Sequence, residues 1–254
     1  MDPDLVLPAR QRVDRRPHAA ATHPLGILTF EPLHPQEAGD IGCAETFPFP
    51  VRYGMISRNA VRRVAHSSDD ALLALYIREA ANLIDQGCIG VVSTCSFLAR
   101  WQTEFTLSLT VPVLTSALLQ VPLVQRLLPH RQRVGIVIAS AIEVDAATLQ
   151  AAGADAFVAI ETVDPDGHFA TGLREPTAAW FRARAATDVV AAARRLVAGH
   201  PHTGAIVLES AAMSAYRDAV ARAVAIPVFS ATQLFSWFYA ALRGSQVPLE
   251  GNPF

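Results

Sequence analysis

The chain has 254 residues, of which 51% are apolar and 17% are charged, and its formal net charge is -2. This length and composition predict a globular protein with a large core, built as one domain or as two of roughly 100–150 residues each. The near-neutral charge disfavours nucleic acid as a partner. No apolar run approaches the roughly 18 residues that span a bilayer, so we expect no association with a membrane.

The cysteine content indicates a reducing compartment. Three cysteines occur, Cys43, Cys88 and Cys95, and an odd number without framework spacing favours free thiols and a cytoplasmic location. Residues 1–24 are rich in Arg, Pro, His and Ala and lack the apolar centre of a secretory signal. We expect them to form a flexible, solvated extension, with an arm that binds anions or contacts another subunit as the alternative.

Taken in order, the chain alternates short apolar strands with helices. Leu25 to Phe30 predicts the first strand, and the proline-rich residues 31–50 predict a long loop over the sheet edge. The apolar spacing from Asp69 to Gln86 is helical. Further strands are predicted at 51–57, 89–93, 111–116, 133–140, 156–161, 204–210 and 226–230. Further helices are predicted at 97–109, 117–128, 141–152, 177–198, 213–225 and 231–243, with a polar loop at 162–176.

This alternation runs through the chain in two similar passes, which favours an α/β fold of parallel sheets covered on both faces. The Val-Pro-Val and Ile-Pro-Val strands that begin at Val111 and Ile226 occupy equivalent places in the two passes. We therefore expect two pseudo-symmetric α/β domains, at 25–132 and 133–230, with the site in the cleft between them. Residues 231–254 are expected to form a C-terminal helix and tail that pack back on the first domain.

Hydroxyl and thiol side chains follow the ends of several predicted strands. Cys95 comes after the apolar strand that begins at Ile89, at the point where the next helix starts. Unpaired N–H groups and the helix dipole at such a junction stabilise a thiolate or a carboxylate. Because ligands bind beyond the carboxyl ends of parallel strands, these strand ends should line one cleft. The other polar strand ends are Thr115-Ser116, Ala139-Ser140 and Glu209-Ser210.

Four motifs spread over the chain carry a family resemblance. They are residues 39–51 (GDIGCAETFPFPV), 93–98 (STCSFL), 112–122 (PVLTSALLQVP) and 208–213 (LESAAM). Together they resemble the motifs of the aspartate/glutamate racemase superfamily, which includes hydantoin racemases, maleate isomerases and arylmalonate decarboxylases. The resemblance implies two flavodoxin-like domains with the site between them, and no cofactor. It also implies two cysteines, one per domain, because inversion at an acidic carbon requires a base on one face and an acid on the other.

Cys95 falls on the first cysteine position of this pattern, and Ser210 stands where the second is expected. A serine hydroxyl is a far weaker acid than a thiol, so we expect one-sided chemistry. The expected reaction is proton transfer, or thiol addition, at the carbon alpha to a carboxylate or carbonyl of a small acid. Ala211, Ala212 and Cys43 are further departures from the pattern in the same cleft. The alternatives are a decarboxylase-like activity or a degenerate relative that binds small carboxylates without turnover.

The remaining site candidates are polar side chains near the predicted cleft. Their hydroxyls could donate to a substrate carboxylate or enediolate, with capping of the following helices as the alternative. Glu209 could act as the missing base or form an ion pair, and Cys43 could substitute for the missing thiol. The candidates for substrate binding are Thr46, Thr94, Ser96, Thr115, Ser116, Glu209 and Cys43.

No metal site is expected, because His200 and His202 flank Pro201 without a third ligand. The expected partner is a small carboxylate or an amino-acid-like substrate. Whether the chain forms a homo-oligomer stays open.

Overall fold

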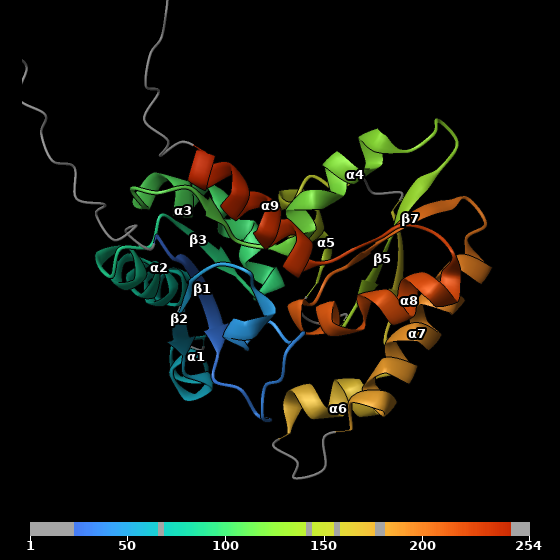
Figure 1. Ribbon diagram of the computed structural model, residues 1–254, viewed down its shortest axis with the longest axis horizontal. Helices are drawn as coiled ribbons and strands as arrows, with labels where there is room; N and C mark the ends of the chain where they lie inside the picture. Colours follow the sequence, from blue (N-terminus) through green and yellow to red (C-terminus); the bar gives the residue numbers. More distant parts are fainter. Residues whose placement is uncertain (1–22, 66–68, 141–143, 155–157, 176–180, 245–254) are drawn as a thin grey trace, which may run out of the picture.

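The computed structural model describes residues 23–65, 69–140, 144–154, 158–175 and 181–244. Two parallel four-stranded sheets lie at the centres of two halves, and helices flank each sheet (Figure 1). The first sheet has the strand order β2-β1-β3-β4 and the second has the order β6-β5-β7-β8. The identical order confirms the predicted fold class, a pair of pseudo-symmetric parallel α/β domains.

The elements have the following bounds. The strands are β1 (Leu25–Phe30), β2 (Val51–Ile56), β3 (Gly90–Ser93), β4 (Val113–Leu114), β5 (Arg133–Ile138), β6 (Ala159–Thr162), β7 (Thr203–Leu208) and β8 (Val228–Phe229). The α-helices are α1 (Arg58–Ala65), α2 (Asp69–Asp85), α3 (Gln102–Ser108), α4 (Val121–Leu127), α5 (Ala146–Ala151), α6 (His168–Arg174), α7 (Arg182–Gly199), α8 (Arg217–Val224) and α9 (Ala231–Gly244). Short 3-10 helices are η1 (Ala44–Thr46), η2 (Ser96–Trp101), η3 (Ala117–Gln120) and η4 (Ala211–Tyr216).

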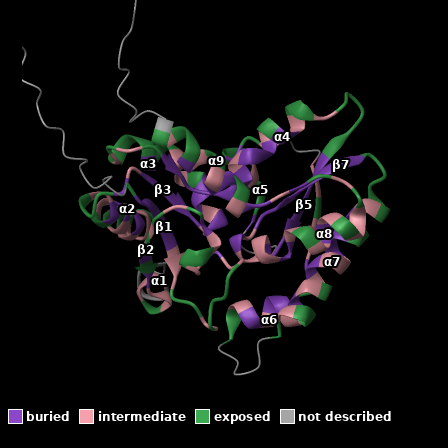
Figure 2. Ribbon diagram, in the orientation of Figure 1, coloured by how far each residue is buried: buried purple, intermediate pink, exposed green. Residues whose placement is uncertain are grey.

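Apolar clusters fill the space on both faces of each sheet, as the buried strands and the inward helix faces in Figure 2 show. In the first half, Leu28 packs with Tyr76 of α2 on one face, and Ile27 packs with Phe235 of α9 on the other. In the second half, α7 covers one face and α4 and α5 cover the other. Strands buried on both faces read as continuous apolar runs, and for this reason they could be predicted.

The C-terminal helix α9 returns to the first half. Phe235 is fully buried there, and the Tyr239 hydroxyl donates to the His23 carbonyl at 3.0 Å. Gly90 on β3 permits the close approach, because a Cβ at that position would lie 2.4 Å from Leu242 Cδ1. The predicted extension before residue 23 and the tail after residue 244 lie outside the described residues. The predicted domain boundaries themselves stay a prediction.

The predicted polar loop at 162–176 is wrong between residues 168 and 174, which form α6. Phe169 is fully buried in the cluster formed with α7. Its backbone N–H donates to the Asp188 carboxylate on α7 at 2.9 Å. A helix this short is marginal alone, so contacts with α7 stabilise it, and these contacts do not show in the local sequence.

Several predicted boundaries also differ from the structure. The predicted helices at 97–109, 117–128 and 213–225 each split into a 3-10 helix followed by an α-helix. Three strands end two residues earlier than predicted, at Leu114, Ile138 and Leu208, because the residues that follow leave the sheet.

Other differences concern helix starts. The predicted helix 141–152 begins at Ala146, where the Asp145 side chain accepts from the Thr148 N–H at 2.9 Å and caps α5. α1 was not predicted at all. Predicted residues within 141–143, 155–157 and 176–180 lie outside the described residues. None of the helices in the described part of the chain has the length and apolar content to cross a membrane.

Candidate active site

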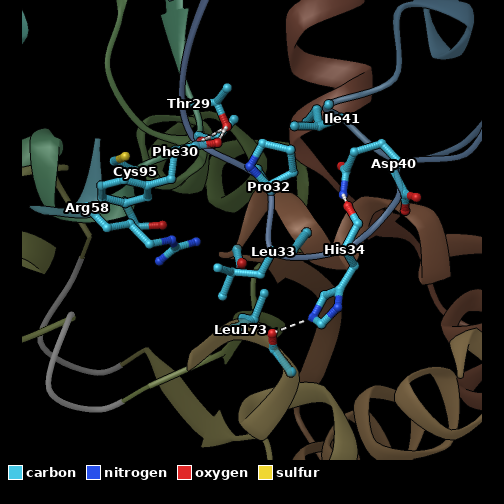
Figure 3. A pocket seen from close by; sticks show the side chains of 18 of the residues that line it. Thr29, Phe30, Pro32, Leu33, His34, Asp40, Ile41, Arg58, Cys95 and Leu173 are labelled. Carbon is cyan, nitrogen blue, oxygen red and sulfur yellow. Dashed lines mark hydrogen bonds between the residues drawn. The ribbon is translucent and has the colours of Figure 1, made fainter. Parts of the chain in front are cut away.

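A cavity of about 200 Å³ lies at the carboxyl ends of β1, β3 and β7, with walls from both halves (Figure 3). The first half contributes Thr29 and Phe30 at the end of β1 and residues 94–97 after β3. The second half contributes residues 209–212 after β7 and part of α6. This edge of the sheets is where α/β folds of this kind bind ligands.

Cys95 and Ser210 occupy equivalent positions in the two halves. β3 pairs with β4, and β7 pairs with β8, in the same register, so Val91 corresponds to Ile206. Cys95 stands four residues beyond Val91, and Ser210 stands four residues beyond Ile206. Each directly precedes a six-residue 3-10 helix, η2 or η4, and neither side chain makes a capping hydrogen bond. Both residues line the cavity, so the structure brings the two predicted catalytic residues to one site.

Cys95 lies at the wall of the cavity, and the residue is 4% exposed. The Cys95 backbone N–H donates to Ser93 Oγ at 3.0 Å, which fixes the turn out of β3. Behind the thiol, the hydroxyl oxygen of Tyr76 lies 3.8 Å from Sγ. The thiol therefore has the cavity on one side and a phenol on the other.

Glu209 is a buried carboxylate in the cavity wall, 2% exposed. Its side chain accepts a hydrogen bond from the Ala139 N–H, just beyond β5, at 3.0 Å. Its backbone carbonyl lies 3.3 Å from the donating Ser96 hydroxyl of η2. Glu209 thus ties the tip of β7 to its own sheet and to the first half.

Two predicted binding hydroxyls line the cavity and already have protein partners. Thr94 Oγ1 donates to Thr29 Oγ1 at 3.1 Å, and Ser96 Oγ donates to the Glu209 carbonyl. A hydroxyl oxygen that donates can still accept, and each could reorient toward a bound carboxylate.

Thr115 and Ser116 are fully buried and are not among the described residues that line the cavity. The Thr115 hydroxyl donates to Gln102 Oε1 at 2.7 Å. Ser116 Oγ accepts from the Leu118 N–H at 3.1 Å and caps η3. For Ser116 the geometry matches the capping alternative.

Cys43 and Thr46 also lie away from the cavity wall as the described residues define it. The Cys43 thiol donates to the Glu45 carboxylate at 2.9 Å, and this hydrogen bond raises the pKa of Cys43. Thr46 accepts from the Gly39 N–H at 3.0 Å and so shapes the preceding loop. In this geometry Cys43 is a protonated thiol outside the site.

Residues 31–43, which we call the strap, cross the mouth of the cavity from the first half to the second. His34 Nε2 lies 2.6 Å from the Gly172 carbonyl of α6. The Arg182 guanidinium of α7 donates to the Asp40 carboxylate at 2.6 Å. Figure 3 shows the strap residues over the cavity, with the histidine directed to α6. The strap therefore closes one side of the site and is held by the opposite half.

Arg58 and Tyr216 line the cavity and were not predicted as site residues. The Arg58 guanidinium lies 4.8 Å from the centre of the Phe30 ring, and Figure 3 shows the two side by side. Within the described residues, the Arg58 Nε is buried and has no hydrogen-bond partner. Burial raises the pKa of Tyr216 to about 12, which keeps its phenol neutral and able to donate. Arg58 comes two residues after the end of β2, so its place at the same sheet edge could have been inferred.

The cavity combines a thiol, hydroxyls, a cation and the N-terminal turns of two 3-10 helices. The first N–H groups of a helix have no partner within it and can bind negative charge. These groups can hold a carboxylate and stabilise an enediolate. Among the residues that the structure describes, no group of three or more His, Cys, Asp and Glu side chains could hold a metal ion.

Comparison with known proteins gives relatives of low identity. No family model matches the chain. A dimethylsulfoniopropionate lyase from Durusdinium sp. clade D is 22% identical over 216 residues, which cover 82% of this chain and 71% of the lyase.

Solved structures with a similar fold include arylmalonate decarboxylase, with 16% identity, a TM-score of 0.60, and coverage of 89% of this chain and 94% of the decarboxylase. A glutamate racemase isoform from Bacillus anthracis has 11% identity, a TM-score of 0.54 and coverage of 88% and 82%. An aspartate racemase homologue from Pyrococcus horikoshii OT3 has 10% identity, a TM-score of 0.55 and coverage of 87% and 99%. The chain thus has the two-domain α/β fold of these racemases and this decarboxylase, the fold that the sequence resemblance implied.

Proposed function

We propose that this protein is a cofactor-independent enzyme of the aspartate/glutamate racemase superfamily. It would remove a proton from the carbon alpha to a carboxylate or carbonyl of a small acid, using the Cys95 thiolate as base. The observation that carries the proposal is the pair of equivalent strand tips, with Cys95 at one and Ser210 at the other, in a cavity between the two halves.

Proton removal places negative charge on the substrate. Cys95 Sγ takes the proton, and the electron pair of the broken C–H bond moves into an enediolate on the carboxylate. Arg58 and the hydroxyls of Thr94 and Ser96 lie in the same cavity and can stabilise that charge. In comparable sites, one such donor contributes roughly 3 kcal/mol to transition-state stabilisation.

Ser210 sets the fate of the intermediate. The Ser210 hydroxyl is a weak acid, so the proton returns from the Cys95 side and the configuration is kept. The same geometry supports a decarboxylation: the bond to CO2 breaks, its electron pair forms the enediolate, and the Cys95 S–H supplies the proton to carbon.

A second candidate is a β-elimination, favoured by the similarity to a lyase. Cys95 would take the alpha proton, the bond from the beta carbon to its leaving group would break, and a carbon–carbon double bond would form. This reaction needs one base and no acid on the opposite face, which suits Ser210 as the partner of Cys95.

Deuterium exchange tests the proposal. The protein is incubated in D2O with aspartate, glutamate, an arylmalonate and dimethylsulfoniopropionate, and label at the alpha carbon, CO2 and dimethyl sulfide are measured. On the acid that reacts, Cys95→Ser should lower the rate by at least about 100-fold. Cys43→Ser makes the same atom change outside the cavity and should leave the rate unchanged. Wild-type rates in Cys95→Ser would contradict the proposal, and binding without exchange in the wild type would favour a non-catalytic carboxylate-binding protein.

A further inference from the structure

The Cys95 thiol has a buried tyrosine behind it. Tyr76, on α2, is 0% exposed, and its hydroxyl oxygen lies 3.8 Å from Cys95 Sγ, within hydrogen-bond distance for sulfur. Its ring packs edge-on against Phe97, with the ring centres 5.8 Å apart. Tyr76 is not among the described residues that line the cavity, so it contacts the thiol rather than a bound molecule.

We propose that Tyr76 is a positioning residue of the site, whose hydroxyl donates a hydrogen bond to the Cys95 sulfur and stabilises its thiolate form. The inference rests on the proposed function, in which Cys95 is the base. A donor aimed at an ionised acceptor favours the charged form, and such bonds are stronger than neutral ones. The edge contact with Phe97 and the burial on α2 keep the phenol oxygen pointed at sulfur.

Other charged or titratable groups share the cavity with Cys95, and each could act on the thiolate. They are His34 and Asp40 on the strap, Arg58 on α1, Glu209 after β7 and Tyr216 on η4. Tyr76→Phe leaves all of them in place and removes one oxygen atom. A change in thiol ionisation in that variant therefore reports on the phenol.

The test measures how the ionisation of Cys95 depends on Tyr76. Full-length wild type and Tyr76→Phe are treated with iodoacetamide from pH 5 to pH 10, and alkylation of the Cys95 peptide is followed by mass spectrometry. The thiolate reacts, so the alkylation rate rises as pH passes through the pKa of the thiol. The pH at which the rate reaches half its maximum is the Cys95 midpoint. We expect this midpoint to rise by about one pH unit in Tyr76→Phe, which makes alkylation at pH 7 about tenfold slower.

Tyr239→Phe is the matched control. Tyr239 is also a buried tyrosine of the first half, and its hydroxyl donates to the His23 carbonyl, away from the cavity. Its loss should leave the Cys95 midpoint unchanged. An unchanged midpoint in Tyr76→Phe would overturn the inference.

Should Tyr76→Phe fail to fold, 3,5-difluorotyrosine at position 76 keeps the ring and makes the phenol a stronger donor. The Cys95 midpoint should then fall, and a midpoint that stays in place would also overturn the inference. Alkylation needs no turnover, so this test is separate from the test of the proposed function. Wild-type turnover in Cys95→Ser would contradict the proposed function, whatever the Cys95 midpoint is in Tyr76→Phe.

Discussion

At the scale of single residues, the difference between sulfur and oxygen at Ser210 decides what the site can do. The two halves place Cys95 and Ser210 at equivalent strand tips, so the backbone would position two thiols equally well. Only the side-chain atom differs. A free cysteine thiol ionises near its pKa of about 8.5, whereas a serine hydroxyl stays protonated in water at any ordinary pH.

Restoring the sulfur gives a direct prediction. In Ser210→Cys, a second base faces the substrate, so an optically pure acid that exchanges in the wild type should now racemise as well. Chiral chromatography of the recovered acid measures this. Ser214→Cys puts a thiol on the same 3-10 helix, outside the set of described residues that line the cavity, and should not racemise the acid. Exchange that keeps its configuration in Ser210→Cys would contradict equivalence of the two positions.

At the scale of elements, the strap connects the two halves over the site. Its own residues form no α-helix or strand, so its position depends on contacts with α6 and α7. The Asp40 and Arg182 side chains are 16% and 29% exposed, which makes their ion pair partly shielded from water. A pair of this kind contributes up to about 1 kcal/mol. Loss of the pair should let the strap open more often.

Proteolysis can measure this opening. The protease Glu-C cleaves after glutamate, and Glu37 lies within the strap. Arg182→Ala removes the ion pair with Asp40 and the longer one, at 3.8 Å, with Glu37 itself. It should speed cleavage after Glu37 by about fivefold, because loss of about 1 kcal/mol raises the open population by that factor. Arg195→Ala removes another arginine of α7, one that pairs with Glu161 at 2.7 Å, and should leave the cleavage rate unchanged. Equal rates in the two variants would show that Arg182 does not hold the strap.

At the scale of the whole molecule, the sequence predicts the fold better than the site. Strands buried on both faces leave continuous apolar runs, and the repeated order of elements needs no knowledge of distant contacts. The positions of Cys95 and Ser210 at the cavity wall could also be predicted, since a strand end fixes where its next residues lie. α6 could not be predicted, because its stability comes from packing on α7.

The hydroxyls show why the rest of the site could not be predicted. After a strand, a serine or threonine can cap the next helix or bind a ligand, and the local sequence is the same for both. Ser96 lies in the cavity, whereas Ser116 is fully buried at the start of η3, which packs against β7 of the second half. Tyr76 reads as one of several core residues on the inner face of α2, and only the packing of α2 on β3 brings its oxygen to Cys95.

The first domain is built from both ends of the chain, and this makes its stability depend on α9. β1 begins at Leu25, and α9 covers the sheet that contains β1. Phe235 of α9 is fully buried in the apolar cluster that it forms with Leu25 and Ile27. Phe235→Ala should therefore lower the free energy of unfolding by about 3–5 kcal/mol, through lost burial and the cavity left behind. Trp237→Ala changes an aromatic residue of the same helix that is 60% exposed, and should change it by about 0.5 kcal/mol or less. Urea unfolding followed by far-UV circular dichroism measures both, and equal losses in the two variants would mean that α9 does not complete the core of the first domain.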